Sequence, residues 1–215
     1  MDFDLEAELR KLINQGKVQK SIELAESKLR SLEKTDFHKV LGRSLLHQAE
    51  FLSEYMQFFY DAAIGFYKNE HKGFFRSIFK KKANSLRNLK SAYVEMNAFT
   101  INPDRWFLDF FAYSQIGSRE DFDWLADFDY VGESSFTIEG FEDLQQVYSE
   151  YVKGKNWEIE QQQKASNVCE LIIVLRLQEL FLSISEKATA QNRSWSTLPI
   201  FVTAHDYEMI LELPK

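Results

Sequence analysis

Carboxylates are the side chains in this sequence whose number and spacing could support chemistry. They are densest from Asp104 to Asp143, where eleven acidic residues and two arginines give a formal charge of −9. Carboxylate oxygens are preferred ligands of Mg²⁺ and Mn²⁺, and these ions can activate water for phosphoester hydrolysis. A metal-dependent phosphoester hydrolase is therefore one hypothesis, with the candidate ligands Asp104, Asp109, Asp121, Asp123, Asp127, His205 and Asp206.

Other signatures of catalysis are missing from the sequence. It contains no G-x-S-x-G, no G-x-x-x-x-G-K-[ST], no G-x-G-x-x-G, no H-E-x-x-H and no pair of cysteines for zinc. Four histidines are scattered along the chain, so a histidine-based site would have to be assembled by the fold. The favoured prediction is a protein with no catalytic residues, no cofactor and no metal, and the hydrolase is kept as an alternative.

Aromatic residues lie among the same carboxylates. An acidic surface rimmed by aromatic rings suits a basic protein partner, because the charges steer association and the rings anchor it. The residues predicted to bind such a partner are Asp121, Asp123, Trp124, Asp127, Phe128, Asp129 and Tyr130. A second alternative is a structural scaffold or homodimer subunit, in which the same rings belong to the core. Solvent exposure of Trp124 and Phe128 would distinguish the two.

Two short helices are predicted to carry this surface. Pro103 is typical of the first turn of a helix, and Gly117 of a helix end. Ser118 then resembles the cap of a second helix. On that helix Asp123 and Asp127, four residues apart, would share one face.

The rest of the sequence also favours helices. Only 3 prolines and 8 glycines interrupt 215 residues, and apolar side chains recur at helical spacing in most segments. The C-terminal part differs, because residues 198–204 and 207–213 alternate in the manner of two short strands. The predicted fold is therefore all-α. It comprises a multi-helix bundle over residues 1–193 and a small β-hairpin over residues 194–215, packed on the bundle as an appendage.

The segment VCELIIVLRLQELFLSI, residues 168–184, is apolar on nearly every side and predicts a buried central helix. Cys169 cannot form a disulfide within the chain, because it is the single cysteine, and it is predicted to fill the core. A buried Arg176 would need a carboxylate partner, and the acidic segment, residues 104–143, could supply one.

Net charge and hydropathy indicate which classes of partner are to be expected. The formal net charge of −7 argues against nucleic acid as the main partner. The N-terminus is acidic and amphipathic, and no apolar run reaches membrane-spanning length, so we expect a cytoplasmic protein without membrane insertion. Residues 68–90 reverse the charge to +7. They are interpreted as a turn and helix start, with a membrane-surface or nucleic-acid patch as the alternative. Whether they pair with residues 104–143 is left open.

Two resemblances add to these predictions. INQGKVQKSIELAESKL, residues 13–29, is similar to one helical hairpin of a tetratricopeptide repeat, which implies a partner-binding scaffold, although no second copy follows at the repeat period. EMNAFTINPDRWFLDFFAY, DWLADFD, FTIEGFEDLQ and TAHDYE resemble segments of uncharacterised bacterial helical proteins, some of them associated with toxin-neutralising, immunity-type genes. This second resemblance implies an inhibitor of a basic protein toxin.

Overall fold

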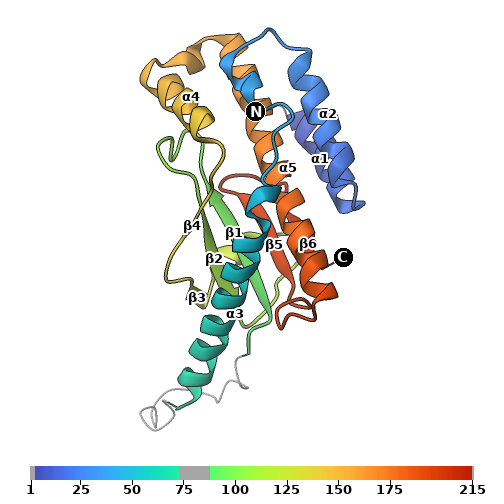
Figure 1. The fold of residues 1–215 in the computed structure, drawn as a ribbon, viewed down its shortest axis with the longest axis vertical. Coiled ribbons are helices and arrows are strands. Elements are labelled where there is room, and N and C mark those ends of the chain that lie inside the picture. Colours follow the sequence, from blue (N-terminus) through green and yellow to red (C-terminus); the bar gives the residue numbers. More distant parts are fainter. Residues whose placement is uncertain (1–2, 73–87, 215) are drawn as a thin grey trace.

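The computed structural model, which describes residues 3–72 and 88–214, combines α-helices with a six-stranded mixed β-sheet (Figure 1). The α-helices are α1 (Phe3–Asn14), α2 (Val18–Arg30), α3 (Ala49–Lys72), α4 (Glu142–Lys153) and α5 (Glu160–Ala190). The 3-10 helices are η1 (Asp36–Val40), η2 (Leu46–Gln48), η4 (Asp123–Ala126) and η5 (Asn156–Glu158). The strands are β1 (Ser91–Asn97), β2 (Phe107–Tyr113), β3 (Tyr130–Val131), β4 (Phe136–Thr137), β5 (Ile200–Ala204) and β6 (Leu211–Leu213).

The sheet has the strand order β3-β2-β1-β5-β6, and β4 also pairs with β2. β1 and β5 are parallel, while the other pairs are antiparallel. The register places Glu95 of β1 opposite Asp109 of β2 on one side and Thr203 of β5 on the other. Because the neighbouring strands β1 and β5 run in the same direction, polar residues near their C-terminal ends lie close together at the same end of the sheet.

The all-α prediction is wrong. Ser91–Asn97, which falls in the predicted helical bundle, and Phe107–Tyr113, which falls in the short helix predicted between Pro103 and Gly117, form the adjacent antiparallel strands β1 and β2. Both faces of this part of the sheet carry apolar rings, so the alternation typical of a strand is hidden in the sequence. Phe110, for example, packs on α3 through Phe59 at a ring-centroid distance of 5.5 Å. Its neighbour Phe111 faces the other way and contacts Phe128.

The C-terminal hairpin is present, but it is no appendage. β5 and β6 pair antiparallel, as the alternation predicts. β5 also pairs with β1 along residues 92–96, which places it inside the sheet. The sheet therefore continues across the expected boundary between residues 193 and 194.

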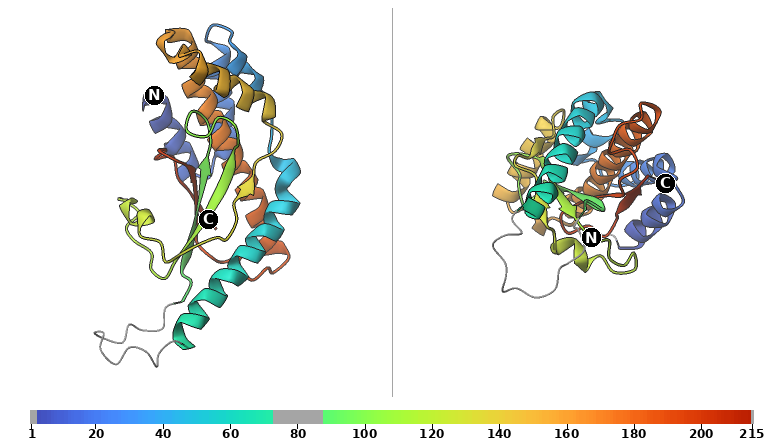
Figure 2. Two further views of the ribbon diagram at one scale, coloured as in Figure 1. Left: turned by 90° about the vertical axis from the view of Figure 1, so that its left-hand side faces the viewer. Right: turned by 90° about the horizontal axis from the view of Figure 1, so that it is seen from below.

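Helix α5 is the centre of the core. It contacts α2, α3 and β5. Cys169 on this helix is fully buried and unpaired, which confirms its predicted place in the core. The two faces of the sheet are covered differently, with α3 and α5 on one face and the segment of residues 117–129 on the other (Figure 2).

Arg176 is buried on α5, and its carboxylate partners lie on helices. Its Nη2 is 2.8 Å from Oε1 of Glu26 on α2, and its Nη1 is 3.0 Å from Oε2 of Glu179. The prediction that a buried Arg176 needs a carboxylate is confirmed, while the proposed source in the acidic segment is wrong. α2 packs on both α1 and α5, so the two N-terminal helices form a pair that lies against the central helix.

None of the described helices combines the length and the hydropathy needed to cross a bilayer. Most of the basic segment, residues 68–90, lies outside the described residues, so its interpretation as a turn and helix start stays a prediction and its pairing with residues 104–143 stays open.

Candidate functional site

Residues 117–129, the central part of the acidic segment (residues 104–143), are held on the sheet by their aromatic side chains. The ring centroid of Trp124 lies 5.1 Å from that of Tyr113 and 5.3 Å from that of Phe201, both in edge-to-face arrangements. The indole Nε1 of Trp124 donates a hydrogen bond to the carbonyl oxygen of Ser118 at 2.9 Å. The predicted second helix is replaced by the single turn η4, because the apolar side chains of this segment pack down onto the sheet.

Gly117 leaves the space that Trp124 occupies. A Cβ atom at position 117 would lie 2.3 Å from Cδ1 of the indole, a distance at which Trp124 has to move. We therefore expect Gly117→Ala to lower the free energy of unfolding by about 1–3 kcal/mol, the usual cost of overpacking. Urea denaturation measures this change. Gly65→Ala on α3 is the control, since a Cβ there meets nothing within 4 Å and alanine favours helix; an equal loss in both variants would contradict the role of Gly117.

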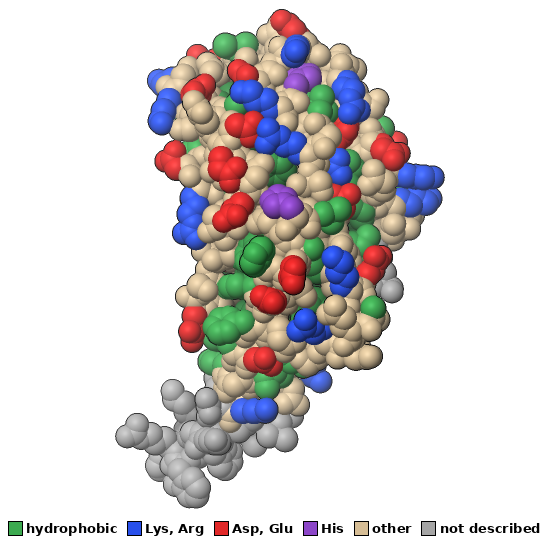
Figure 3. All heavy atoms as spheres, in the orientation of Figure 1, with side chains coloured by type: hydrophobic (Ala, Val, Ile, Leu, Met, Phe, Trp, Pro, Cys, Tyr) green, Lys and Arg blue, Asp and Glu red, His purple; other side chains and the backbone are tan. Residues whose placement is uncertain are grey.

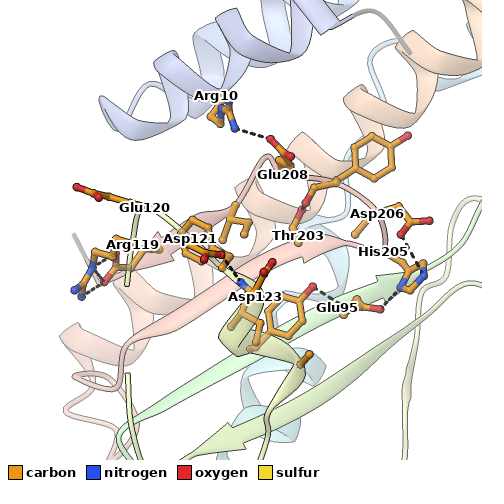
Figure 4. Close-up of a pocket in the computed structure, with 18 of the residues that line it drawn as sticks. Arg10, Glu95, Arg119, Glu120, Asp121, Asp123, Thr203, His205, Asp206 and Glu208 are labelled. Atoms are coloured by element: carbon orange, nitrogen blue, oxygen red, sulfur yellow. Dashed lines mark hydrogen bonds and ion pairs between the residues drawn. The ribbon is translucent and has the colours of Figure 1, made fainter. Parts of the chain in front are cut away.

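A cleft of about 1300 Å³ lies between this segment, α1 and the turn that joins β5 to β6 (Figure 4). Its polar lining comes from four parts of the chain that are far apart in sequence. These residues are Arg10 and Asn14 on α1, Glu95 on β1, Arg119, Glu120, Asp121 and Asp123 on the acidic segment, and Thr203, His205, Asp206, Glu208 and Glu212 near β5 and β6. Tyr93, Phe122, Leu125 and Ile210 are among the apolar residues of the lining.

The lining is strongly acidic. Seven carboxylates and two arginines give it a formal charge of −5 with His205 neutral. Both arginines are already paired, Arg10 with Glu208 at 2.9 Å and Arg119 with Glu212 at 2.6 Å. On the face shown in Figure 3, by contrast, acidic and basic side chains are interspersed.

His205 and Glu95 form the best-defined polar contact of the cleft. Nδ1 of His205 is 2.6 Å from Oε1 of Glu95, and the hydroxyl of Tyr93 donates to Oε2 of Glu95 at 2.9 Å. Nε2 of His205 is 3.5 Å from the carboxylate of Asp206. The hydrogen bond that His205 donates to the carboxylate of Glu95 raises the pKa of His205 above its ordinary value.

Because of the ion pair between His205 and Glu95, we expect the stability of the fold to depend on pH. Because the pKa of His205 is higher in the folded than in the unfolded chain, its contribution is fully present below about pH 6.5 and is lost as pH rises through the folded-state pKa. The loss in free energy of unfolding caused by His205→Gln is therefore expected to be larger at about pH 6 than at about pH 9. Urea denaturation of both proteins at the two pH values measures it. A loss that grows with pH would contradict the ion pair.

Asp109 adds a carboxylate next to the cleft, directly opposite Glu95 across β1 and β2. Its Oδ2 accepts a hydrogen bond from Nδ2 of Asn97 at 2.9 Å. Burial raises the pKa of Asp109, and the nearby charge of Glu95 raises it further.

Comparisons with protein-family models, curated proteins and solved structures find no match to this chain. The site therefore has to be interpreted from its own geometry.

The structure divides the seven residues predicted to bind a partner. Asp121 and Asp123 are exposed and line the cleft. Asp127 is exposed and lines a separate cavity of about 280 Å³. Phe128 is 46% exposed, and its ring centroid lies 4.8 Å from that of Phe111. Trp124 is partly buried under its own segment.

The other two predicted residues have roles in the fold. Asp129 accepts hydrogen bonds from the backbone N–H and the hydroxyl of Ser114 at 2.6 and 2.7 Å. Tyr130 packs between the rings of Phe59 and Phe66 of α3. Both residues therefore join the acidic segment to the rest of the molecule.

The candidate metal ligands are only partly brought together. Asp121, Asp123, His205 and Asp206 line one cleft, but Asp104 accepts a hydrogen bond from Ser149 on α4. Among the side chains that the structure describes, no three from His, Cys, Asp or Glu are arranged to hold a metal ion.

Sequence reasoning missed Glu95, Tyr93 and Arg10 as site residues. Glu95 is a carboxylate in an otherwise apolar run, AYVEM, and such a residue is the one signal that could have been followed. Its partner His205 is 110 positions away, and only the parallel pairing of β1 with β5 makes them neighbours.

Proposed function

We propose that this protein is a non-catalytic binding module that takes a basic segment of a protein partner into its acidic cleft. The observation that carries the proposal is the charge balance of the lining. Glu120, Asp121 and Asp123 are exposed at the cleft, and no lysine, arginine or histidine among the described residues pairs with them. Three neighbouring carboxylates repel one another, so a cationic partner lowers the energy of this arrangement.

The shape and the apolar lining fit the same partner. Lysine and arginine have apolar stems as well as charged ends. Phe122, Leu125 and Ile210 offer apolar surface to such stems, next to the carboxylates that would receive the charged ends. A cleft of this size accommodates several side chains of a partner rather than one small ion.

A basic protein toxin is one candidate partner. Two of the segments that resemble immunity-type bacterial proteins, residues 123–129 and 203–208, contribute residues to the cleft lining. An immunity-type inhibitor that acts by binding needs no catalytic group of its own, which agrees with the proposal.

A fluorescein-labelled heptalysine peptide tests the charge preference. Binding is measured by fluorescence anisotropy at low salt, and a labelled heptaglutamate peptide is the control. We expect heptalysine to bind and its affinity to fall steeply with added salt, because screening weakens exposed charge interactions. Equal binding of the two peptides, or an affinity that salt leaves unchanged, would contradict the proposal.

A further inference from the structure

A third cavity, of about 360 Å³, lies where α4, η5 and α5 meet. Its lining combines hydroxyl, amide, carboxyl and aromatic groups. These belong to Thr100, Tyr151, Val152, Trp157, Gln163, Ser166, Asn167 and Glu170. It shares no lining residue with the cleft.

Glu170 is the charged group of this cavity. Its Oε1 accepts a hydrogen bond from the hydroxyl of Ser166 at 3.1 Å, and its Oε2 accepts one from the hydroxyl of Tyr207. No lysine, arginine or histidine in the described parts of the chain pairs with it. Burial raises the pKa of this carboxyl, because its charged form is separated from water.

Each carboxylate oxygen of Glu170 can accept a further hydrogen bond. A carboxylate has about four acceptor positions in total, and two of them are used by the hydroxyls. The remaining positions are available to a donor that enters the cavity.

Two aromatic rings complete the cavity. Tyr151 and Trp157 have ring centroids 6.4 Å apart and an interplanar angle of 75°. Trp157 is 42% exposed, which is unusual for a tryptophan that packs on its own domain. Aromatic rings beside a carboxylate are a known arrangement for an organic cation, since the faces of the rings attract positive charge.

We propose that this cavity binds a small organic ammonium group, such as the end of a lysine side chain or a free alkylamine. Glu170 provides the counter-charge, Tyr151 and Trp157 form the aromatic walls, and the alkyl part of the ligand lies against Val152. The site shares no lining residue with the acidic cleft, and Tyr207, which lines the cleft, reaches it only through the hydrogen bond from its hydroxyl to Glu170.

The unmodified protein gives the first test, with n-butylammonium chloride as the probe and n-butanol as a neutral molecule of similar size. The indole N–H signal of Trp157 is followed by NMR during each titration at neutral pH. We expect a saturable shift with n-butylammonium and a much smaller one with n-butanol. No saturable shift with n-butylammonium, or equal shifts with both compounds, would overturn the proposal.

Variants then assign the contact to Glu170. Glu170→Gln keeps the shape and acceptor oxygen of the side chain but removes its charge, and it is expected to weaken n-butylammonium binding about ten- to a hundredfold. Glu158→Gln is the matched control, because it removes an exposed carboxylate beside Trp157 that lies outside the cavity. Binding that is weakened equally by both substitutions would show a general charge effect and contradict the site. Lysine substitutions in the acidic cleft should leave n-butylammonium binding unchanged, so a failure of the cleft proposal does not affect this result.

Discussion

Arg176→Met is expected to lower the free energy of unfolding by about 3 kcal/mol, the lower end of the range for breaking a buried ion pair. The side chains of Arg176 and Glu26 are only 10% and 9% exposed, so the substitution leaves Glu26 buried without its main partner. Arg30 still pairs with Glu26 at 2.7 Å, which is why we expect the lower end of the range. Urea denaturation monitored by circular dichroism measures the change.

The same pair predicts how the loss depends on pH. Burial raises the pKa of Glu26, but hydrogen bonds from the Gly42 N–H and from Arg176 outweigh it and hold the pKa below its ordinary value of 4.5. A depressed folded-state pKa stabilises the fold above about pH 4.5, and this contribution disappears as pH falls through that pKa. The difference between the natural protein and Arg176→Met should therefore shrink in acid.

Arg10→Met is the control for this experiment. Arg10 pairs with Glu208 at the surface, where the two side chains are 45% and 83% exposed, and solvent screens such pairs. It should cost much less stability than Arg176→Met. Equal losses from the two substitutions would contradict the structural importance of the buried pair.

The second large effect concerns the acidic cleft. Glu120→Lys combined with Asp123→Lys is expected to weaken heptalysine binding roughly a hundredfold at low salt, since four units of charge change within reach of the peptide. Asp121 is kept because its Oδ1 accepts a hydrogen bond from the backbone N–H of residue 123 at 2.9 Å and shapes the loop. Fluorescence anisotropy gives the affinity, and circular dichroism checks the fold.

The matched control reverses two exposed carboxylates outside the cleft, Asp127 and Glu133, to lysine. Both double variants change the formal net charge of −7 by the same amount, so they differ only in where the charge lies. If the control weakens heptalysine binding as much as the cleft variant does, overall charge explains the affinity and the cleft does not.

Sequence reasoning was accurate where one signal dominates. The continuous apolar character of residues 168–184 predicted the buried part of α5, and alternation predicted that β5 and β6 form a hairpin. It failed where two signals overlap. In β2, aromatic side chains occur at helical spacing while both faces of the strand are covered, so the period of two could not be recognised.

The candidate site was predicted only in part, for a related reason. Local composition identified Asp121 and Asp123, because charge density is visible in a short window of sequence. It placed Asp123 and Asp127 on one helix face, whereas η4 ends at Ala126 and directs them to different cavities. Glu95 and Glu208 belong to the same cleft through strand pairing, which a local pattern does not encode.

An NMR titration of the ¹⁵N-labelled protein with unlabelled heptalysine tests the central claim most directly, because it shows where a basic peptide binds. The account predicts that backbone amide signals of residues 119–126 and 203–208 shift together and saturate together. Shifts confined to other surfaces, such as α4 or residues 128–134, with the signals around the cleft unchanged, would contradict it.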